Sequence, residues 1–174
     1  VLEPLYQATQ ALVQAAPPSQ IVMVDPNCRP MVMRNSYAFQ QSWECVLERS
    51  DIIKVSAEDV AFLFPDKDAL LAVEGLHDRT GTTVLFTDGP HSVHVYAGGR
   101  SLTLSVPTVP VIDTVGAGDS FSGGFLAYWV SHDLSRLDLV NIQQVGAAAE
   151  LGIRVAGLTC QRSGADPPWA TDLG

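Results

Sequence analysis

The first half of the chain alternates amphipathic stretches with short runs in which almost every residue is apolar. Apolar residues recur at helical spacing in the amphipathic stretches, which predicts helices there. The apolar runs end in turn residues and are typical of strands that a parallel sheet buries on both faces. The predicted helices cover residues 3–16, 36–49, 56–63 and 66–76, and the predicted strands cover residues 21–24, 51–55 and 82–87. Such alternation predicts right-handed β-α-β units and a sheet covered by helices on both sides.

The pattern changes at residue 91. Residues 91–96 and 102–106 alternate apolar and polar positions around a glycine-containing turn, which predicts an antiparallel hairpin at the edge of the sheet. A helix that is apolar on all sides follows up to Val130, and its Gly123-Gly124 pair predicts close backbone packing. The last predicted helix covers residues 137–157. The expected fold class is therefore α/β, with a mostly parallel sheet and an antiparallel hairpin edge.

Composition and charge indicate which class of protein this is and which partners are disfavoured. The 174 residues are 47% hydrophobic, which predicts one globular domain over residues 1–174. No apolar run is long enough to cross a bilayer, and the three cysteines are widely separated, which predicts a soluble protein in a reducing, cytoplasmic compartment. Ten basic residues against 19 acidic ones give a net charge of -9, which argues against nucleic acid or an anionic membrane as a partner. Any phosphate must then be held by backbone amides.

Residues 113–121 carry the candidate chemistry. Gly116, Ala117 and Gly118 leave their N–H groups uncovered at the predicted start of a buried helix, where the helix dipole favours an anion. Asp119 follows directly, and two interpretations of it stand side by side. It is either a helix-start residue favoured by the dipole or a base that accepts a proton from an alcohol. A glycine-rich turn that only caps a core helix is the purely structural alternative.

The stretch Asp113-Thr114-Val115-Gly116-Ala117-Gly118-Asp119-Ser120-Phe121, followed by Gly123-Gly124, resembles the C-terminal signature of the ribokinase-like (PfkB-type) carbohydrate kinases. Shorter matches occur in the family's order along most of the chain: Asp25-Pro26-Asn27 with Arg29, Val55-Ser56-Ala57-Glu58-Asp59, Thr87-Asp88-Gly89, and Thr159-Cys160-Gln161-Arg162 before Gly164-Ala165. The resemblance implies a three-layer α/β/α fold. Because family members are longer and the chain begins at Val1, we expect the C-terminal, nucleotide-binding portion of such a kinase, without its N-terminal strands and lid.

The resemblance also implies roles for the residues of the long motif. Asp119 matches the general base, and Gly116, Ala117 and Gly118 match the anion hole that stabilises charge on the transferred phosphoryl group. Asp113 and Val115 match positions that offer oxygens to a monovalent cation such as K⁺, with backbone carbonyls near residues 162–164 completing its shell.

The remaining implied site residues lie at the ends of two predicted strands, except for Thr114, which belongs to the long motif. Thr87 and Gly89, together with Thr114, match nucleotide-contacting positions. Asn27 and Arg29 match positions facing the phosphates or the acceptor, with a surface salt bridge as the alternative for Arg29.

A metal role is implied less directly by the resemblance. Ser56 and Asp59 fall where the family often has Asn and Glu that organise Mg²⁺. Asp59 is therefore a candidate for binding Mg²⁺ through water, and a helix cap is the alternative.

The resemblance implies ATP-dependent phosphoryl transfer to a hydroxyl of a sugar or sugar acid, with ATP, Mg²⁺ and a small sugar-like acceptor as partners. We expect the 174-residue chain by itself to show little activity, because acceptor positioning and water exclusion need the missing portion. A non-catalytic nucleotide- or sugar-sensing module and a nucleoside kinase stay open as alternatives. An unpaired sheet edge would also leave homo-oligomerisation open.

Overall fold

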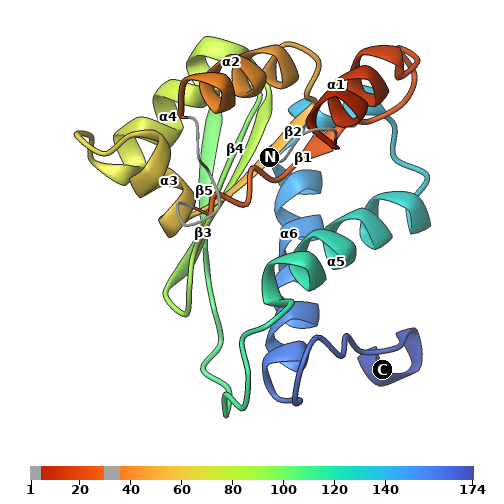
Figure 1. Ribbon diagram of the computed structural model, residues 1–174. Coiled ribbons are helices and arrows are strands. Elements are labelled where there is room, and N and C mark those ends of the chain that lie inside the picture. The colour runs from red at the N-terminus through yellow and green to blue at the C-terminus, as the bar shows by residue number, and fades with distance from the viewer. Residues whose placement is uncertain (1–4, 30–35) are drawn as a thin grey trace.

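The computed structural model describes residues 5–29 and 36–174, and these form a five-stranded sheet between two layers of helices (Figure 1). The strands are β1 (Met23–Val24), β2 (Ile52–Ser56), β3 (Thr83–Asp88), β4 (Ser92–Ala97) and β5 (Arg100–Ser105), in that spatial order. The pairs β1–β2 and β2–β3 are parallel, and the pairs β3–β4 and β4–β5 are antiparallel. The predicted α/β class and the antiparallel hairpin at the edge are confirmed, and β4 alone of these strands runs against the others.

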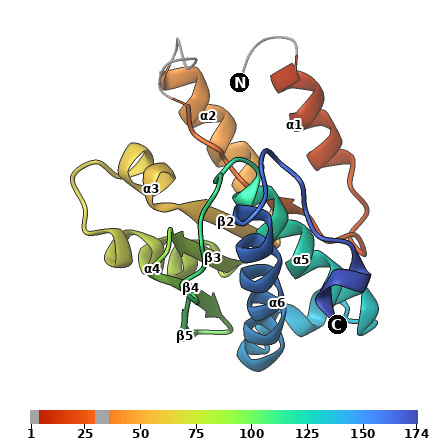
Figure 2. The ribbon, with the colours of Figure 1, turned by 90° about the horizontal axis from the view of Figure 1, so that it is seen from below.

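The helices cover both faces of the sheet. They are α1 (Leu5–Ala15), α2 (Ser36–Leu47), α3 (Ala57–Leu63), α4 (Ala69–Thr80), α5 (Ala117–Ser131) and α6 (Ile142–Cys160), with short 3-10 turns η1 (Arg136–Val140) and η2 (Ala170–Leu173). Figure 2 shows α5 and α6 side by side on one face and α3 and α4 on the other. The first two residues of the predicted helix 3–16 lie outside the described residues. Within the part described, no helix is both long and apolar enough to cross a membrane.

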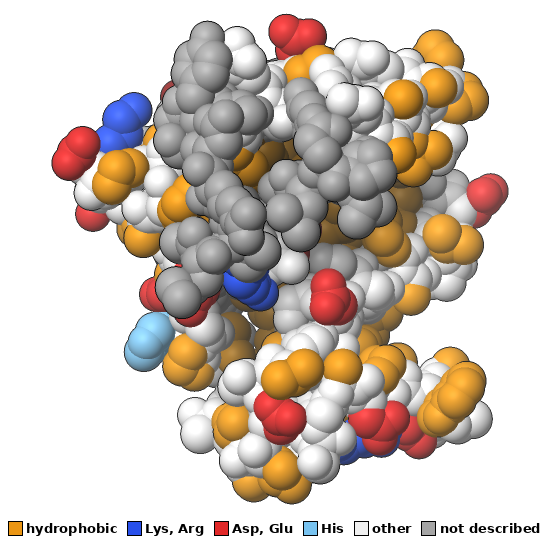
Figure 3. All heavy atoms as spheres, in the orientation of Figure 1, with side chains coloured by type: hydrophobic (Ala, Val, Ile, Leu, Met, Phe, Trp, Pro, Cys, Tyr) orange, Lys and Arg blue, Asp and Glu red, His pale blue; other side chains and the backbone are white. Residues whose placement is uncertain are grey.

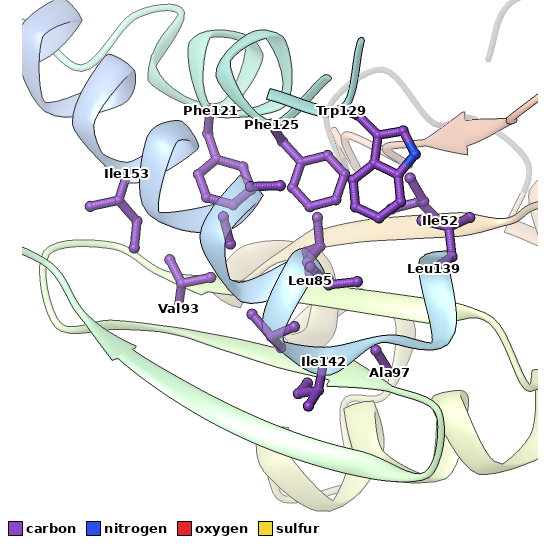
Figure 4. Close-up of a cluster of buried hydrophobic side chains, with 14 residues drawn as sticks. Ile52, Leu85, Val93, Ala97, Phe121, Phe125, Trp129, Leu139, Ile142 and Ile153 are labelled. Carbon is purple, nitrogen blue, oxygen red and sulfur yellow. The ribbon is translucent and has the colours of Figure 1, made fainter. Parts of the chain in front are cut away.

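Successive side chains of the strands point to opposite faces of the sheet and pack in two separate hydrophobic cores. On the face covered by α5 and α6, Ile52 and Leu85 of the sheet meet the aromatic side chains of α5 (Figure 4). Phe125 is fully buried there, and its ring stacks on that of Trp129 with a centroid separation of 5.6 Å. On the opposite face, Ile53 packs with side chains from α2, α3 and α4. Because successive strand residues point to opposite faces, the neighbouring residues Ile52 and Ile53 of β2 pack in different cores.

The close packing predicted from the glycine pair occurs at Gly124. A Cβ atom placed on Gly124 would lie 2.9 Å from Cγ2 of Val155 and 3.0 Å from Cα of Gly152 on α6. Gly123 is exposed, and a Cβ atom there would meet nothing within 4 Å. One glycine of the pair therefore lets α5 approach α6 closely.

The predicted single helix over residues 137–157 is wrong. A 3-10 turn ends at Val140, and α6 begins only after Asn141, whose backbone is extended at φ -86° and ψ 101°. The Asn141 side chain accepts hydrogen bonds from the N–H groups of Gln143 and Gln144, which makes it the N-cap of α6. A capping side chain thus interrupts a helical pattern that hydrophobic spacing alone leaves continuous.

Candidate active site

The carboxyl ends of β1, β2 and β3 lie along the same edge of the sheet. The parallel register pairs Val24 with Ile53 and Ser56 with Thr87, so the segments that follow these strands share that edge. Ligands gather at this edge in open α/β folds. The structure therefore brings the predicted residues after β1, β2 and β3 to one side of the molecule.

Three of the predicted residues at this edge are exposed, and one is half-buried. Asn27 is exposed, adopts a positive φ of 43°, and donates its N–H to Oδ1 of Asp25 at 3.0 Å. Exposed Arg29 donates to the carbonyl of Cys28 and forms no ion pair within residues 5–29 and 36–174. Half-buried Thr87 donates to the carbonyl of Val55 at 3.4 Å, and Gly89 is exposed at the end of β3.

Helix α5 begins inside the glycine-rich motif. Gly116 is its N-cap at φ 78°, a conformation that disfavours residues with a Cβ, and it has no side chain with which to cap the helix. The N–H of Ala117 donates to the carbonyl of Thr114 at 3.2 Å, and the N–H of Ser120 donates to that of Gly116 at 2.8 Å. Of the three amides predicted as an anion hole, that of Ala117 therefore already has an acceptor.

Three N–H groups at this end, those of Gly116, Gly118 and Asp119, have no acceptor among the described residues. The last two, Gly118 and Asp119, belong to the first turn of α5, where free donors are expected because the helix has no side-chain cap. The Asp119 carboxylate is exposed and receives no hydrogen bond from the described part of the chain. An anion at these two amides would also meet the positive end of the helix dipole.

Asp113 ties the turn before α5 to the turn after α6. Its Oδ1 accepts the N–H of Val115 at 3.0 Å, and its Oδ2 accepts the N–H of Gly164 at 2.9 Å. These backbone hydrogen bonds hold the pKa of the Asp113 carboxyl below its ordinary value. The fold thus brings together the two segments that were predicted to surround a monovalent cation, and cation binding itself stays a prediction.

Asp59 has the role of a helix cap. It is 2% exposed, and its Oδ2 accepts from the N–H of Ser56 at 2.9 Å and from Oγ of Ser56 at 2.7 Å, while the Ser56 side chain accepts from the N–H of Asp59. Its Oδ1 accepts the N–H of Cys28 at 2.6 Å, so the carboxylate also fastens the segment after β1. Burial, and then the nearby charge of Asp59, raise the pKa of the Cys28 thiol to about 12. This is the capping alternative that the sequence left open.

The described residues do not form a cage for Mg²⁺. They contain no group of three or more His, Cys, Asp or Glu side chains placed to hold a metal ion, and both oxygens of Asp59 already accept hydrogen bonds. Mg²⁺ in kinases is commonly held by substrate phosphates and one or two carboxylates. A water-mediated contact from Asp59 stays a prediction, and no catalytic step below is assigned to the metal.

Sequence reasoning missed Lys54, which lies within β2. The residue is 4% exposed, and its Nζ donates to Oδ2 of Asp25 at 2.8 Å. A Cβ atom placed on Gly118 would lie 3.0 Å from the same Nζ, so the ammonium lies against the first turn of α5. Figure 2 shows the start of α5 beside β2. The signal in the sequence was a single lysine inside the otherwise apolar run Ile52-Ile53-Lys54-Val55.

Two surface cavities lie away from this edge. One, of about 680 Å³, is lined by residues that precede β2 and β3, including Ser50 and Thr82, and so lies at the amino ends of these strands. The other, of about 730 Å³, is lined by Phe39 and Trp43 of α2 and Phe62 of α3. Neither is lined by any of the predicted site residues.

The chain matches the family model of the pfkB family carbohydrate kinases over residues 2–172. It is 31% identical over 153 residues to a fructokinase from Rhizobium leguminosarum bv. trifolii, an alignment that covers 87% of this chain and 45% of the relative. The chain belongs to the pfkB family of carbohydrate kinases.

Solved structures agree with this assignment. The structure of fructokinase with bound ATP from Xylella fastidiosa superposes with a TM-score of 0.80 at 25% identity, covering 94% of this chain and 53% of that one. The ribokinase of Thermotoga maritima has the same fold, with a TM-score of 0.71 at 20% identity over 92% of this chain and 48% of that one. The predicted ribokinase-like fold and family resemblance are confirmed. The chain spans about half the length of the relatives it matches.

Proposed function

We propose that this protein transfers the γ-phosphoryl group of ATP to a hydroxyl group of a sugar or sugar acid. The observation that carries the proposal is the start of α5, where the exposed Asp119 carboxylate adjoins two amides without acceptors, those of Gly118 and Asp119. Membership of the pfkB family supports a carbohydrate acceptor. The fructokinase relative and the ATP-bound fructokinase structure support fructose and ATP as the first substrates to test.

In the proposed reaction, Asp119 is the general base. The Asp119 carboxylate accepts the proton of the acceptor hydroxyl while that oxygen forms a bond to the γ-phosphorus. The bond between the γ-phosphorus and the β,γ-bridging oxygen breaks, and ADP leaves with that oxygen. The amides of Gly118 and Asp119, with the dipole of α5, stabilise the charge that spreads over the phosphoryl oxygens. A positioned base contributes about 10²–10⁴-fold to the rate in reactions of this kind.

The other site residues take supporting roles in this proposal. Thr87, Gly89 and Thr114 contact the nucleotide, and Asn27 and Arg29 face the phosphates or the acceptor. Asp113 and the backbone of Val115 offer oxygens to a monovalent cation such as K⁺. Mg²⁺, bound by the nucleotide phosphates, would neutralise part of their charge.

We propose this kinase activity for the full-length protein. For the 174 residues alone we propose nucleotide binding with little turnover, because the chain spans about half of the relatives' length. Full catalysis needs an acceptor held in line with the γ-phosphorus and shielded from water.

The test measures ADP release by the full-length protein with fructose, ribose, 2-keto-3-deoxygluconate or adenosine as the acceptor. We expect turnover with a sugar or sugar acid, and Asp119→Asn should reduce it by about 10²–10⁴-fold while ATP still binds in calorimetry. Asp133→Asn is the matched control, because Asp133 is an exposed carboxylate just beyond the other end of α5.

The outcomes separate the alternatives. Full turnover by the Asp119→Asn variant would exclude Asp119 as the base. Turnover with adenosine alone would identify a nucleoside kinase. ATP binding without turnover on any acceptor would favour the sensing module.

A further inference from the structure

Lys54 is a buried cation in a chain that has few cations. The sequence contains two lysines, Lys54 and Lys67, and Lys67 is exposed. The Lys54 side chain is 6% exposed and extends from a strand whose other residues pack in the two hydrophobic cores or begin α3. Burying an ammonium group is costly unless it is paired, and the Asp25 carboxylate at 2.8 Å supplies the pairing.

The ammonium has donors to spare. It carries three N–H groups, and its one hydrogen bond to a described residue goes to Asp25. Its nitrogen lies 3.0 Å from the position that a Cβ of Gly118 would occupy. Because Gly118 has no side chain, nothing of residue 118 separates the ammonium from the first turn of α5.

This placement brings two positive poles together. The start of α5 carries roughly half a positive charge from its aligned peptide dipoles, and the Lys54 ammonium adds a full charge beside it. Cations are stabilising at the other end of a helix, so stability alone disfavours this arrangement. Neither Gly118 nor Asp119 has an acceptor for its N–H within the described ranges. An anion at that point would face both positive groups and would accept hydrogen bonds from donors that have no acceptor among the described residues.

Basic side chains are sparse on the face of the molecule that Figure 3 draws. Figure 3 shows Lys and Arg side chains only as isolated spots on one face, with Asp and Glu side chains scattered around them. With a net charge of -9, the protein has no general attraction for a phosphate group. A local cation at the amides is therefore the feature that would favour an anion there.

We propose that Lys54 is a phosphate-binding residue, whose ammonium contacts an oxygen of a nucleotide phosphoryl group bound at the amides of Gly118 and Asp119. Asp25 is its positioning residue: the carboxylate holds one N–H of the ammonium and so directs the others toward α5. This inference rests on the nucleotide site of the proposed function and assigns its cationic contact.

The test begins with the wild-type chain, in which ¹⁵N-labelled lysine gives two side-chain signals. Both nitrogens can be detected through their ε-methylene protons, which do not exchange with water. During titration with ATP, the Lys54 Nζ resonance should shift with the fraction bound and the Lys67 resonance should stay constant. Adenosine, which lacks phosphates, should leave both resonances in place.

Two variants give an independent measure. Lys54→Met removes the charge and keeps an unbranched side chain, and Lys67→Met is the matched control. We expect Lys54→Met to weaken ATP binding at least tenfold in calorimetry and to change adenosine binding less than twofold. If the unpaired Asp25 prevents folding of Lys54→Met, the double variant Asp25→Asn/Lys54→Met removes both charges and is measured in its place.

The possible failures are distinguishable. If the wild-type chain binds neither ATP nor ADP, the nucleotide site of the proposed function fails, and this inference fails with it. If ATP binds but neither the Lys54 resonance nor the affinity of the variant changes, this inference alone is overturned. Equal losses of ATP and adenosine affinity would likewise overturn it, because they indicate a structural role for Lys54.

Discussion

Oδ2 of Asp113 accepts the N–H of Gly164 at 2.9 Å and thereby joins the turn before α5 to the turn after α6. The other carboxylate oxygen accepts the N–H of Val115, so both oxygens organise backbone around the start of α5. Asp113 and Gly164 are far apart in the sequence, and the contact depends on α5 and α6 packing side by side. The geometry of the candidate phosphate site therefore depends in part on one ionised carboxylate.

The Asp113 contact predicts a local response to acid. Its pKa is lowered in the folded protein, so the stabilisation is present above the ordinary pKa of 3.8 and is lost as the pH falls through the lowered value. We expect the amide proton signals of Val115 and Gly164 to titrate together in NMR spectra with a midpoint below 3.8. The Asp113→Asn variant should lack this titration. A shared midpoint at or above 3.8 in the wild type would contradict the prediction.

Asp59→Ala distinguishes the capping role from a metal role. The substitution leaves the N–H groups of Ser56 and Cys28 without their acceptor, so we expect a loss of about 1–3 kcal/mol in the free energy of unfolding. If capping is the whole role of Asp59, the Mg²⁺ dependence of ATP binding should stay unchanged. Denaturant unfolding and calorimetry measure the two effects, and exposed Glu58→Ala in the same turn is the control. A variant with wild-type stability and altered Mg²⁺ dependence would instead indicate a metal role.

Phe125→Ala tests the core beneath α5. Phe125 is fully buried and stacks on Trp129, so truncation leaves a cavity between α5 and the sheet. The expected loss is about 3–5 kcal/mol in the free energy of unfolding. Val130→Ala, at a position 80% exposed on the same helix, should change it by less than about 0.5 kcal/mol. Similar losses in the two variants would mean that this face of α5 is not the buried one.

Asn141→Ala tests the cap that divides η1 from α6. Its side chain accepts two backbone hydrogen bonds at the start of α6, and alanine cannot replace them, so we expect a loss of about 1 kcal/mol in unfolding experiments. Asn141→Asp keeps the acceptor and should retain most of the stability. Gln143→Ala, an exposed change at the second residue of α6 that keeps the backbone N–H donated to Asn141, is the neutral control. If Asn141→Asp lost as much stability as Asn141→Ala, capping would not explain the break.

Much of the fold could be predicted because its signals are local. The apolar runs of β2 and β3, the alternation of the hairpin and the Ser56–Asp59 capping box depend on neighbouring residues. The break at Asn141 escaped prediction because one side chain that bonds to the backbone competes with a continuous hydrophobic period. Helix α5 begins at Ala117, inside the 113–121 motif. Its N-cap is Gly116, which adopts a left-handed conformation.

The sequence by itself determined the family and the segment that carries the candidate chemistry, because the residues of the 113–121 motif are consecutive. The tertiary structure decided which groups meet at that segment. It gave Asp59 a capping role, placed Gly164 on Asp113, and set the Lys54 ammonium against Gly118. These contacts join residues that are distant in the chain, and they arise only when the sheet brings the ends of its strands to the start of α5. Periodicity and spacing cannot encode such contacts, because both describe neighbours along the chain.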